Sequence, residues 1–280
     1  MNKIVKDALG KCCMLVGRRN LYRISRFLMY TARGDVANTP YNPLLNGESM
    51  VQMVALGVAA SPVTIFDVGA NIGEWTSGLL EISCNLRIPA EVYAFEPCRD
   101  TFAQLSGRYG NRTNVTLINE ACSRQVGTAT MHVYGSGAGT NSLAEPVDDN
   151  EALSENVRLT TIDYYCNANG IGTIDLLKID AEGVDYDVIV GASSMLDKKS
   201  IRILQFEYNQ RWIGSRNYLR DAFNFLVPRG YVIGKLMGPW VEFYPHWRWE
   251  LEHYAEGNYI ACLRDDMDLF QHCEPIWLWP

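Results

Sequence analysis

The stretch VTIFDVGANIGEWT, residues 63–76, predicts a strand that runs through a glycine turn into a helix. Residues 63–68 are mostly apolar and partly β-branched, as in a buried strand, and a helix is expected from about Glu74. Gly69 and Gly73 lie in the turn between them. In α/β proteins this order presents backbone N–H groups to a ligand at the carboxyl edge of the sheet. The stretch therefore predicts a nucleotide-type binding site.

The same alternation of strand and helix continues along the chain. Further strands of a main sheet are expected at residues 91–95, 115–118, 174–179, 201–206, 231–235 and 259–263. Helices are expected at about residues 48–60, 74–83, 100–109, 184–196 and 217–227. This pattern predicts an α/β fold, a Rossmann-like doubly wound and mostly parallel sheet of seven strands.

Two regions depart from that rhythm. Residues 128–134 and 157–161 are expected to form an added β-hairpin, with an acidic surface loop at 145–155 between them. Residues 237–256 are expected to form a loop that contains Trp240, Trp247 and Trp249. These three side chains are expected either to cover the end of the sheet or to form an apolar platform for a sugar.

Composition and charge exclude several classes of protein. With 48% hydrophobic and 20% charged residues in a chain of 280, the sequence is typical of a globular protein. The formal net charge is −7, but residues 1–33 carry +7, which leaves −14 for the remainder. An acidic body argues against nucleic-acid binding. The eight cysteines include no C-x-x-C motif and no zinc-type spacing, so reduced thiols and a cytoplasmic location are expected.

The N-terminal region is predicted to be a basic helical extension, residues 1–45, ahead of the main domain at 46–280. Leu21, Ile24 and Leu28 recur at helical spacing, with arginines between them. Such a helix either packs on the main domain, which is the preferred interpretation, or makes peripheral membrane contact through residues 1–33. No run of residues approaches the ~20 apolar positions of a membrane span.

The glycine spacing indicates which ligand the turn holds. A dinucleotide turn has the pattern G-x-G-x-x-G, whereas this one reads Gly69-x-x-x-Gly73. A carboxylate at Asp67, if it faces the pocket, would repel a pyrophosphate but suits the ammonium group of S-adenosylmethionine. Glu96 ends the second strand, where a carboxylate can accept hydrogen bonds from ribose hydroxyls. Asp180 ends the fourth strand, beside the expected reactive end of the ligand.

Each of these acids also has a purely structural interpretation, as the cap of a turn or helix. Their occurrence at the ends of successive strands favours a common site. We therefore predict a binding site for S-adenosylmethionine. The residues expected to form it are Asp67, Gly69, Ala70, Asn71, Gly73, Thr76, Glu96, Pro97, Glu120, Ala121 and Asp180.

Five segments resemble the FkbM-type S-adenosylmethionine-dependent methyltransferases. They are DVGANIGEWT at 67–76, YAFEP at 93–97, NEA at 119–121, TTID at 160–163 and LLKIDAEGVDYDVIVGA at 176–192. The resemblance spans about residues 60–210 and implies a class I methyltransferase fold. It further implies methyl transfer to hydroxyl oxygens, commonly of sugars or glycosylated natural products.

Carried onto this chain, the resemblance assigns roles to several positions. Asp67, Gly69, Asn71 and Gly73 would line the methionine part of the cofactor, with Glu96 at the ribose. Asp180 and Glu182 would face the methyl group and the acceptor. One departure is Asp185, where the family often has Glu, which casts doubt on any role that needs the longer side chain.

The catalytic residues expected from the sequence are Asp180, Glu182 and Glu207, with His246 as an alternative base. The three acids end adjacent strands, and neighbouring carboxylates raise one another's pKa, which makes a better base for a hydroxyl. The same acids offer ligands for Mg²⁺, but a metal is not predicted. Asn141 and Ser142 lie in the hairpin region and are weaker candidates for acceptor contacts.

The leading hypothesis is an O-methyltransferase that acts on a hydroxyl-bearing acceptor, a saccharide or a glycosylated natural product. A non-catalytic binding or scaffold protein on the same fold is the alternative from another class. The pair of acids at Asp180 and Glu182 argues against that alternative. A nicotinamide-dependent oxidoreductase is disfavoured because the G-x-G turn is missing.

Overall fold

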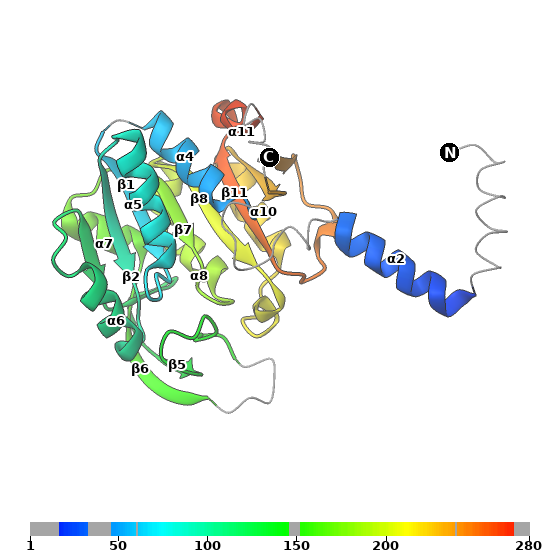
Figure 1. The fold of residues 1–280 in the computed structure, drawn as a ribbon, viewed down its shortest axis with the longest axis horizontal. Coiled ribbons are helices and arrows are strands. Elements are labelled where there is room, and N and C mark those ends of the chain that lie inside the picture. Colours follow the sequence, from blue (N-terminus) through cyan, green and yellow to red (C-terminus); the bar gives the residue numbers. More distant parts are fainter. Residues whose placement is uncertain (1–16, 33–45, 60, 146–151, 239, 272–280) are drawn as a thin grey trace.

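The computed structural model describes residues 17–32, 46–59, 61–145, 152–238 and 240–271. It shows an α/β protein with one large sheet, a small second sheet and an N-terminal helix that stands apart (Figure 1). The first 16 residues and most of the connector before residue 46, both part of the predicted N-terminal extension, lie outside the described residues.

The large sheet has eight strands in the order β10-β9-β11-β8-β7-β1-β2-β3. Their bounds are β1 (Val63–Val68), β2 (Ala90–Phe95), β3 (Val115–Ile118), β7 (Ile174–Ile179), β8 (Ile201–Tyr208), β9 (Tyr231–Leu236), β10 (Val241–Tyr244) and β11 (Gly257–Leu263). The five strands from β8 to β3 pair in parallel, whereas β11, β9 and β10 are antiparallel to their neighbours. The chain reverses direction across the sheet between β1 and β7, and ligands of doubly wound sheets bind at such a switch point.

All seven predicted strands are present in this sheet, and the predicted fold class is confirmed. The eighth strand, β10, lies inside the Trp-rich segment that was expected to be a loop. That expectation was wrong for Val241–Tyr244, which pairs with β9 in an antiparallel register from Val241–Leu236 to Tyr244–Ile233. Only four residues long, the strand is too short to show a period in the sequence.

Helices cover both faces of the large sheet (Figure 1). They are α4 (Glu48–Val58), α5 (Glu74–Leu86), α6 (Arg99–Tyr109), α7 (Ile162–Asn169), α8 (Asp185–Val190), α9 (Ser193–Asp197), α10 (Leu219–Leu226) and α11 (Asp268–Gln271). Successive residues of a strand point to opposite faces, so Ile65 packs with α4 and α5 while Phe66 packs with α7 and α8. The parallel strands are therefore apolar on both faces, which explains their continuous apolar runs.

One predicted helix is divided in two. The sequence predicts a single helix to about residue 196, but α8 ends at Val190 and α9 begins at Ser193. The break contains Gly191, where an added Cβ would lie 2.1 Å from the carbonyl oxygen of Ser123. This close approach of two backbones is set by tertiary packing and leaves no periodic signal in the sequence.

The small sheet consists of β4 (Ala121–Cys122), β5 (Gly127–Val133) and β6 (Leu153–Thr160). β5 and β6 form the predicted hairpin, in an antiparallel register from Gly127–Leu159 to Val133–Leu153. β6 begins at Leu153, so the last residues of the expected 145–155 loop are in fact strand. Residues 146–151 of that loop lie outside the described part. A separate apolar cluster that includes Met131 and Val157 packs this sheet against the turn after β2.

The helix α2 (Arg18–Ala32) projects away from this body in Figure 1. Its described side chains between Arg19 and Leu28 are exposed, apart from the half-buried Leu21. The preferred expectation, a helix packed on the main domain, is therefore wrong for this segment. Within the residues that the structure describes, every helix is too short or too polar to cross a bilayer.

Candidate functional site

The glycine turn after β1 lies between the carboxyl ends of β2 and β7. The N–H groups of Gly69 and Ala70 donate hydrogen bonds to the carbonyl oxygen of Phe95, at 3.0 and 2.9 Å. Gly69 has a φ of +75°, and an added Cβ would lie 1.9 Å from the carbonyl oxygen of Asp180. Glycine is therefore required where the turn crosses the end of β7.

Glu96 is held at the end of β2 by two backbone donors. Its Oε2 accepts a hydrogen bond from the Asn71 N–H at 3.0 Å, and its Oε1 accepts one from the Cys98 N–H at 2.9 Å. Burial raises the pKa of Glu96 to about 7, although these hydrogen bonds favour the ionised form. Each carboxylate oxygen has a further lone pair, which can accept a hydrogen bond from a ribose hydroxyl.

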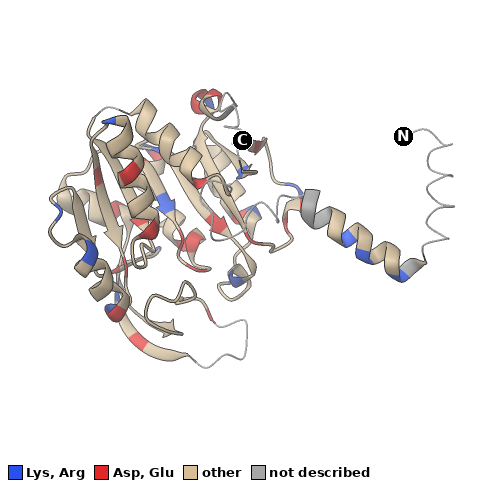
Figure 2. Ribbon diagram, viewed as in Figure 1, with Lys and Arg blue, Asp and Glu red and all other residues tan. Residues whose placement is uncertain are grey.

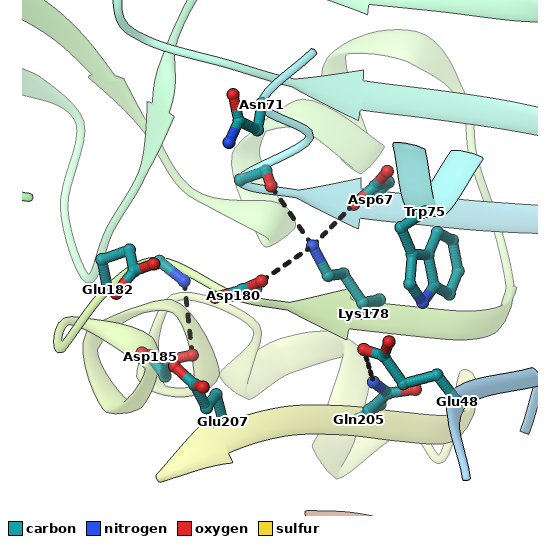
Figure 3. A network of polar contacts seen from close by, with 12 residues as sticks. Glu48, Asp67, Asn71, Trp75, Lys178, Asp180, Glu182, Asp185, Gln205 and Glu207 are labelled. Carbon is teal, nitrogen blue, oxygen red and sulfur yellow. Dashed lines mark hydrogen bonds and ion pairs between the residues drawn. The ribbon is translucent and has the colours of Figure 1, made fainter. Parts of the chain in front are cut away.

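Lys178 lies beneath the glycine turn and connects the ends of two strands (Figure 3). Its ammonium nitrogen is 3.1 Å from Asp67 Oδ1, 3.5 Å from Asp180 Oδ2 and 3.2 Å from the carbonyl oxygen of Gly69. Burial alone would lower the pKa of Lys178, but the charges of Asp67, Asp180 and Glu48 raise it. Lys178 therefore stays charged and ties the turn to the end of β7.

Three carboxylates meet beyond Asp180. Asp180, Glu182 and Glu207 each contribute one carboxylate oxygen to a cluster in which the three oxygens lie within 4.8 Å of one another. Arg211 forms an ion pair with Glu182, and the Asn209 side chain donates a hydrogen bond to Glu207 Oε2 at 2.6 Å. The predicted convergence of these acids is what the structure shows, and we call them the acidic trio.

Two members of the acidic trio, Glu182 and Glu207, bind protons more tightly than isolated carboxyls do. Burial raises the pKa of Glu182 to about 9, the charge of Asp180 adds to this, and Arg211 opposes it. Burial likewise raises the pKa of Glu207, with further contributions from Asp180 and Glu182. The pKa values of both glutamates therefore lie above the usual range of a carboxyl group.

Asp185 supports the backbone that carries the acidic trio. Its carboxylate accepts hydrogen bonds from the N–H groups of Ala181 and Gly183, at 3.3 and 3.2 Å. Glu182, between them, has a φ of +53°, a left-handed conformation that is strained for a residue with a side chain. The short side chain of aspartate spans the distance to this loop, so the support at this position does not need a glutamate.

A cavity opens at this edge of the sheet, with about 640 Å³ of empty space that includes its open mouth. Eight of the predicted site residues line it: Gly69, Asn71, Glu96, Pro97, Glu120, Ala121, Asp180 and Glu182. The turn that follows β5 also lines it, through Gly139 and Asn141, so the hairpin region does reach the pocket. The Ser142 hydroxyl instead donates a hydrogen bond to the carbonyl oxygen of Glu182.

Four predicted cofactor residues do not line the cavity but support its wall. Asp67 is fully buried, where its carboxylate contacts Lys178 and accepts a 2.6 Å hydrogen bond from the Thr76 hydroxyl. Ala70 is buried in the core, and the Gly73 carbonyl accepts a hydrogen bond from the Tyr109 hydroxyl at 2.7 Å. The cation that we expected opposite Asp67, an ammonium group of the ligand, is supplied inside the protein by Lys178.

Two predicted catalytic residues also lie outside the cavity lining. Glu207 reaches Asp180 and Glu182 through the acidic trio, whereas His246 is exposed on the segment after β10. Trp240 and Trp249 are exposed, and Trp247 packs against Arg220 and donates a hydrogen bond to Glu252. None of these three tryptophans lines the cavity.

Several residues at the site were missed from the sequence. Lys178 is a buried charge within the apolar strand IDLLKI, whose other charged residue, Asp175, lies near its start, and a lysine at that position could have been noticed in the sequence. Arg211 follows β8 by three residues and had no comparable signal. No sequence pattern pointed to Met131 and Leu143, because only the folding of the hairpin region brings them to the cavity.

The lining fits a nucleoside-bearing cofactor such as S-adenosylmethionine. Its apolar part comes from Phe95, Ala121, Met131, Leu143 and Val184, a surface suited to an adenine ring. Its polar part includes the Glu96 carboxylate, for ribose hydroxyls. The buried Asn71 Oδ1 accepts no hydrogen bond from the described residues, and it offers an acceptor for a ligand N–H group.

A family model described as Methyltransferase FkbM domain matches residues 67–235. A curated relative, the 2-O-methyltransferase NoeI of Sinorhizobium fredii (strain NBRC 101917 / NGR234), is 28% identical over 176 residues, 57% of this chain and 68% of that protein.

Solved structures with a similar arrangement are more distant. SMU.1697c of Streptococcus mutans, in complex with SAH, has a TM-score of 0.41 and 10% identity over 77% of this chain and 96% of that one. An rRNA methylase from Streptococcus thermophilus has a TM-score of 0.41 and 12% identity over 77% and 95%. The N-methyltransferase NodS from Bradyrhizobium japonicum WM9 has a TM-score of 0.40 and 10% identity over 79% and 96%. These values are low, and the fold class therefore rests on the strand order.

Proposed function

The chain belongs to the FkbM-domain family of methyltransferases, and from this premise we propose that it methylates a hydroxyl oxygen of a saccharide or glycosylated acceptor, with S-adenosylmethionine as methyl donor. The cavity lining supports the choice of donor. The name of the relative NoeI, a 2-O-methyltransferase, supports oxygen as the acceptor atom.

The observation that carries the proposal is the convergence of Asp180 and Glu182, which line the cavity, with Glu207, which lies next to them. A sugar hydroxyl is a weak acid, so methylation of its oxygen needs a group that removes the proton. Nitrogen acceptors with a free lone pair need no such base before they attack. A trio of carboxyls beside the cavity therefore favours a hydroxyl acceptor.

Asp180 is the residue that we assign as the proton acceptor. It lines the cavity, and its side chain is 41% exposed, so an acceptor hydroxyl can reach it. Glu182 is paired with Arg211, and Glu207 lies outside the cavity lining and accepts a hydrogen bond from Asn209. Asp180 is therefore the acid of the trio that lines the cavity without an arginine partner, and we assign it the role of base.

The proposed reaction is a single displacement. S-adenosylmethionine, held by Glu96 and the residues around the glycine turn, would supply a methyl group on a positively charged sulfur. The bond from the acceptor oxygen to the methyl carbon would replace the carbon–sulfur bond, whose electron pair would stay on sulfur. The proton of the hydroxyl passes to the Asp180 carboxylate. Lys178, 3.5 Å from Asp180 Oδ2, holds that carboxylate at the cavity edge, and the Glu182 side chain positions the acceptor.

A metal ion is not part of the proposal. The acidic trio has the oxygen ligands that Mg²⁺ prefers, but Arg211 already places a positive charge on Glu182. We expect methyl transfer to continue in the presence of a chelator such as EDTA. If EDTA abolished turnover and Mg²⁺ restored it, this result would contradict a carboxylate base and favour a hydroxyl activated by a bound metal ion.

The direct test is a panel of saccharides incubated with the protein and S-adenosylmethionine, followed by mass spectrometry of the products. We expect a mass gain of one CH2 unit in an oligosaccharide, as an ether that resists mild base. Methylation of amines alone would contradict the proposal. Calorimetric titration with S-adenosylhomocysteine and with NAD⁺ tests the oxidoreductase hypothesis, because an oxidoreductase would bind NAD⁺. A scaffold protein would bind S-adenosylhomocysteine but would form no methylated product in the saccharide assay.

A further inference from the structure

Helix α2 carries an apolar face that the described part of the body does not cover. On this face the exposed fractions of Ile24 and Leu28 are 49% and 57%. Large apolar side chains exposed together on one short helix are uncommon on a free protein surface and indicate an interaction site. In Figure 1 the helix extends away from both sheets.

Charge and apolar surface are separated around the helix. At 100° per residue, Leu21, Ile24 and Leu28 lie on one face, and Arg19, Arg23 and Arg26 lie on the other. The helix contains no Asp or Glu, and Figure 2 shows the arginines along it without any acidic position. An amphipathic helix with arginines on its polar face is the type that lies in the interface of a membrane.

The body has the opposite charge. Residues 34–280 carry a formal charge of −14, against +7 for residues 1–33. An anionic surface therefore attracts the helix and repels the body. The two effects together would orient the molecule with α2 on the surface and the remaining domain held away from it.

From these observations we propose that α2 docks the protein on an anionic phospholipid bilayer. Leu21, Ile24 and Leu28 would enter the region between head groups and acyl chains, and the arginines would contact lipid phosphates. The helix lies on the membrane and does not cross it, since 15 residues span roughly 22 Å and a bilayer core needs about 30 Å.

A bilayer suits this helix better than a second copy of the chain. A partner must supply negative charge and a continuous apolar seat at the same place. The described body supplies the charge, but its exposed large apolar side chains are scattered over separate elements, for example Leu86 on α5, Leu153 on β6 and Ile213 after β8. A bilayer that contains anionic lipid supplies both along the whole length of the helix.

Flotation of the full-length protein with lipid vesicles tests the proposal. We expect flotation with phosphatidylcholine vesicles that contain phosphatidylserine, and much less with phosphatidylcholine alone or in high salt. Replacing Ile24 and Leu28 together by Gln should abolish it. Replacing Arg19 and Arg23 together by Gln should weaken partitioning on the order of tenfold or more, because each arginine near an anionic surface adds to the attraction.

A matched control removes two positive charges from the body instead. Arg112 and Lys198 are both exposed, and the double variant Arg112→Gln/Lys198→Gln should float as the wild type does. Circular dichroism and titration with S-adenosylhomocysteine show whether each variant is folded. Three results would overturn the proposal: no flotation of the wild type, equal flotation with both kinds of vesicle, or unchanged flotation of both α2 variants. Concentration-dependent dimerisation that the α2 variants abolish, without flotation, would assign the helix to a second copy.

Discussion

The ammonium nitrogen of Lys178 lies 3.1 Å from Asp67 Oδ1, and both side chains are almost fully buried. Removing one partner of a buried ion pair leaves the other charge without compensation, which destabilises a protein strongly. Lys178→Met should therefore lower the free energy of unfolding by roughly 3–5 kcal/mol in urea denaturation. The exposed Lys198→Met is the matched control and should change it by less than about 0.5 kcal/mol.

The double variant Lys178→Met/Asp67→Asn removes both charges of the pair. We expect it to regain part of the stability lost in the single variant, because the fully buried carboxylate of Asp67 no longer lacks a counter-charge. A single variant as stable as the Lys198→Met control would contradict the structural role given to this ion pair.

Gly69→Ala tests the path of the turn over the end of β7. The added methyl group would lie 1.9 Å from the Asp180 carbonyl oxygen, at a φ of +75°, so the turn and the Asp180 backbone must separate. Titration with S-adenosylhomocysteine should show binding weakened by on the order of tenfold or more, with a loss of stability of about 1 kcal/mol or more. At Gly172 a Cβ would meet nothing within 4 Å, and Gly172→Ala should bind normally.

Titration of the Glu96 carboxyl should make the affinity for the cofactor depend on pH. Its raised pKa, about 7, means that the carboxyl is largely protonated below that pH and loses acceptor capacity for ribose hydroxyls. Affinity for S-adenosylhomocysteine should therefore rise by roughly tenfold from about pH 6 to about pH 8. Calorimetry should show a flat profile for Glu96→Gln and a wild-type profile for Glu91→Gln, an exposed position on the same strand. A flat wild-type profile would remove Glu96 from the ribose site.

Much of the fold is readable from the sequence because parallel strands are buried on both faces and so leave long apolar runs. The polar residue that follows each run marks the edge of the sheet, and this is how Glu96, Asp180 and Glu182 were found. Those residues line one cavity because the carboxyl ends of parallel strands meet at the same edge.

The remaining features depend on contacts between distant segments. Asp67 ends its strand as Glu96 does, but only the position of Lys178 shows that its carboxylate is used inside the protein. The division between α8 and α9 follows from the approach of Gly191 to Ser123, and the apolar wall from the hairpin that brings in Met131. Such contacts leave no local periodicity from which they could be predicted.

In the proposed reaction, methyl transfer to a hydroxyl depends most on Asp180 as the base. The direct measurement is the single-turnover rate of transfer from S-adenosylmethionine labelled in its methyl group to a saccharide acceptor, for wild type and Asp180→Asn. We predict a rate lower by on the order of 10²-fold, with the affinity for S-adenosylhomocysteine unchanged within about twofold. An Asp180→Asn variant that transfers the label to oxygen at the wild-type rate would contradict the assignment of Asp180 as the base.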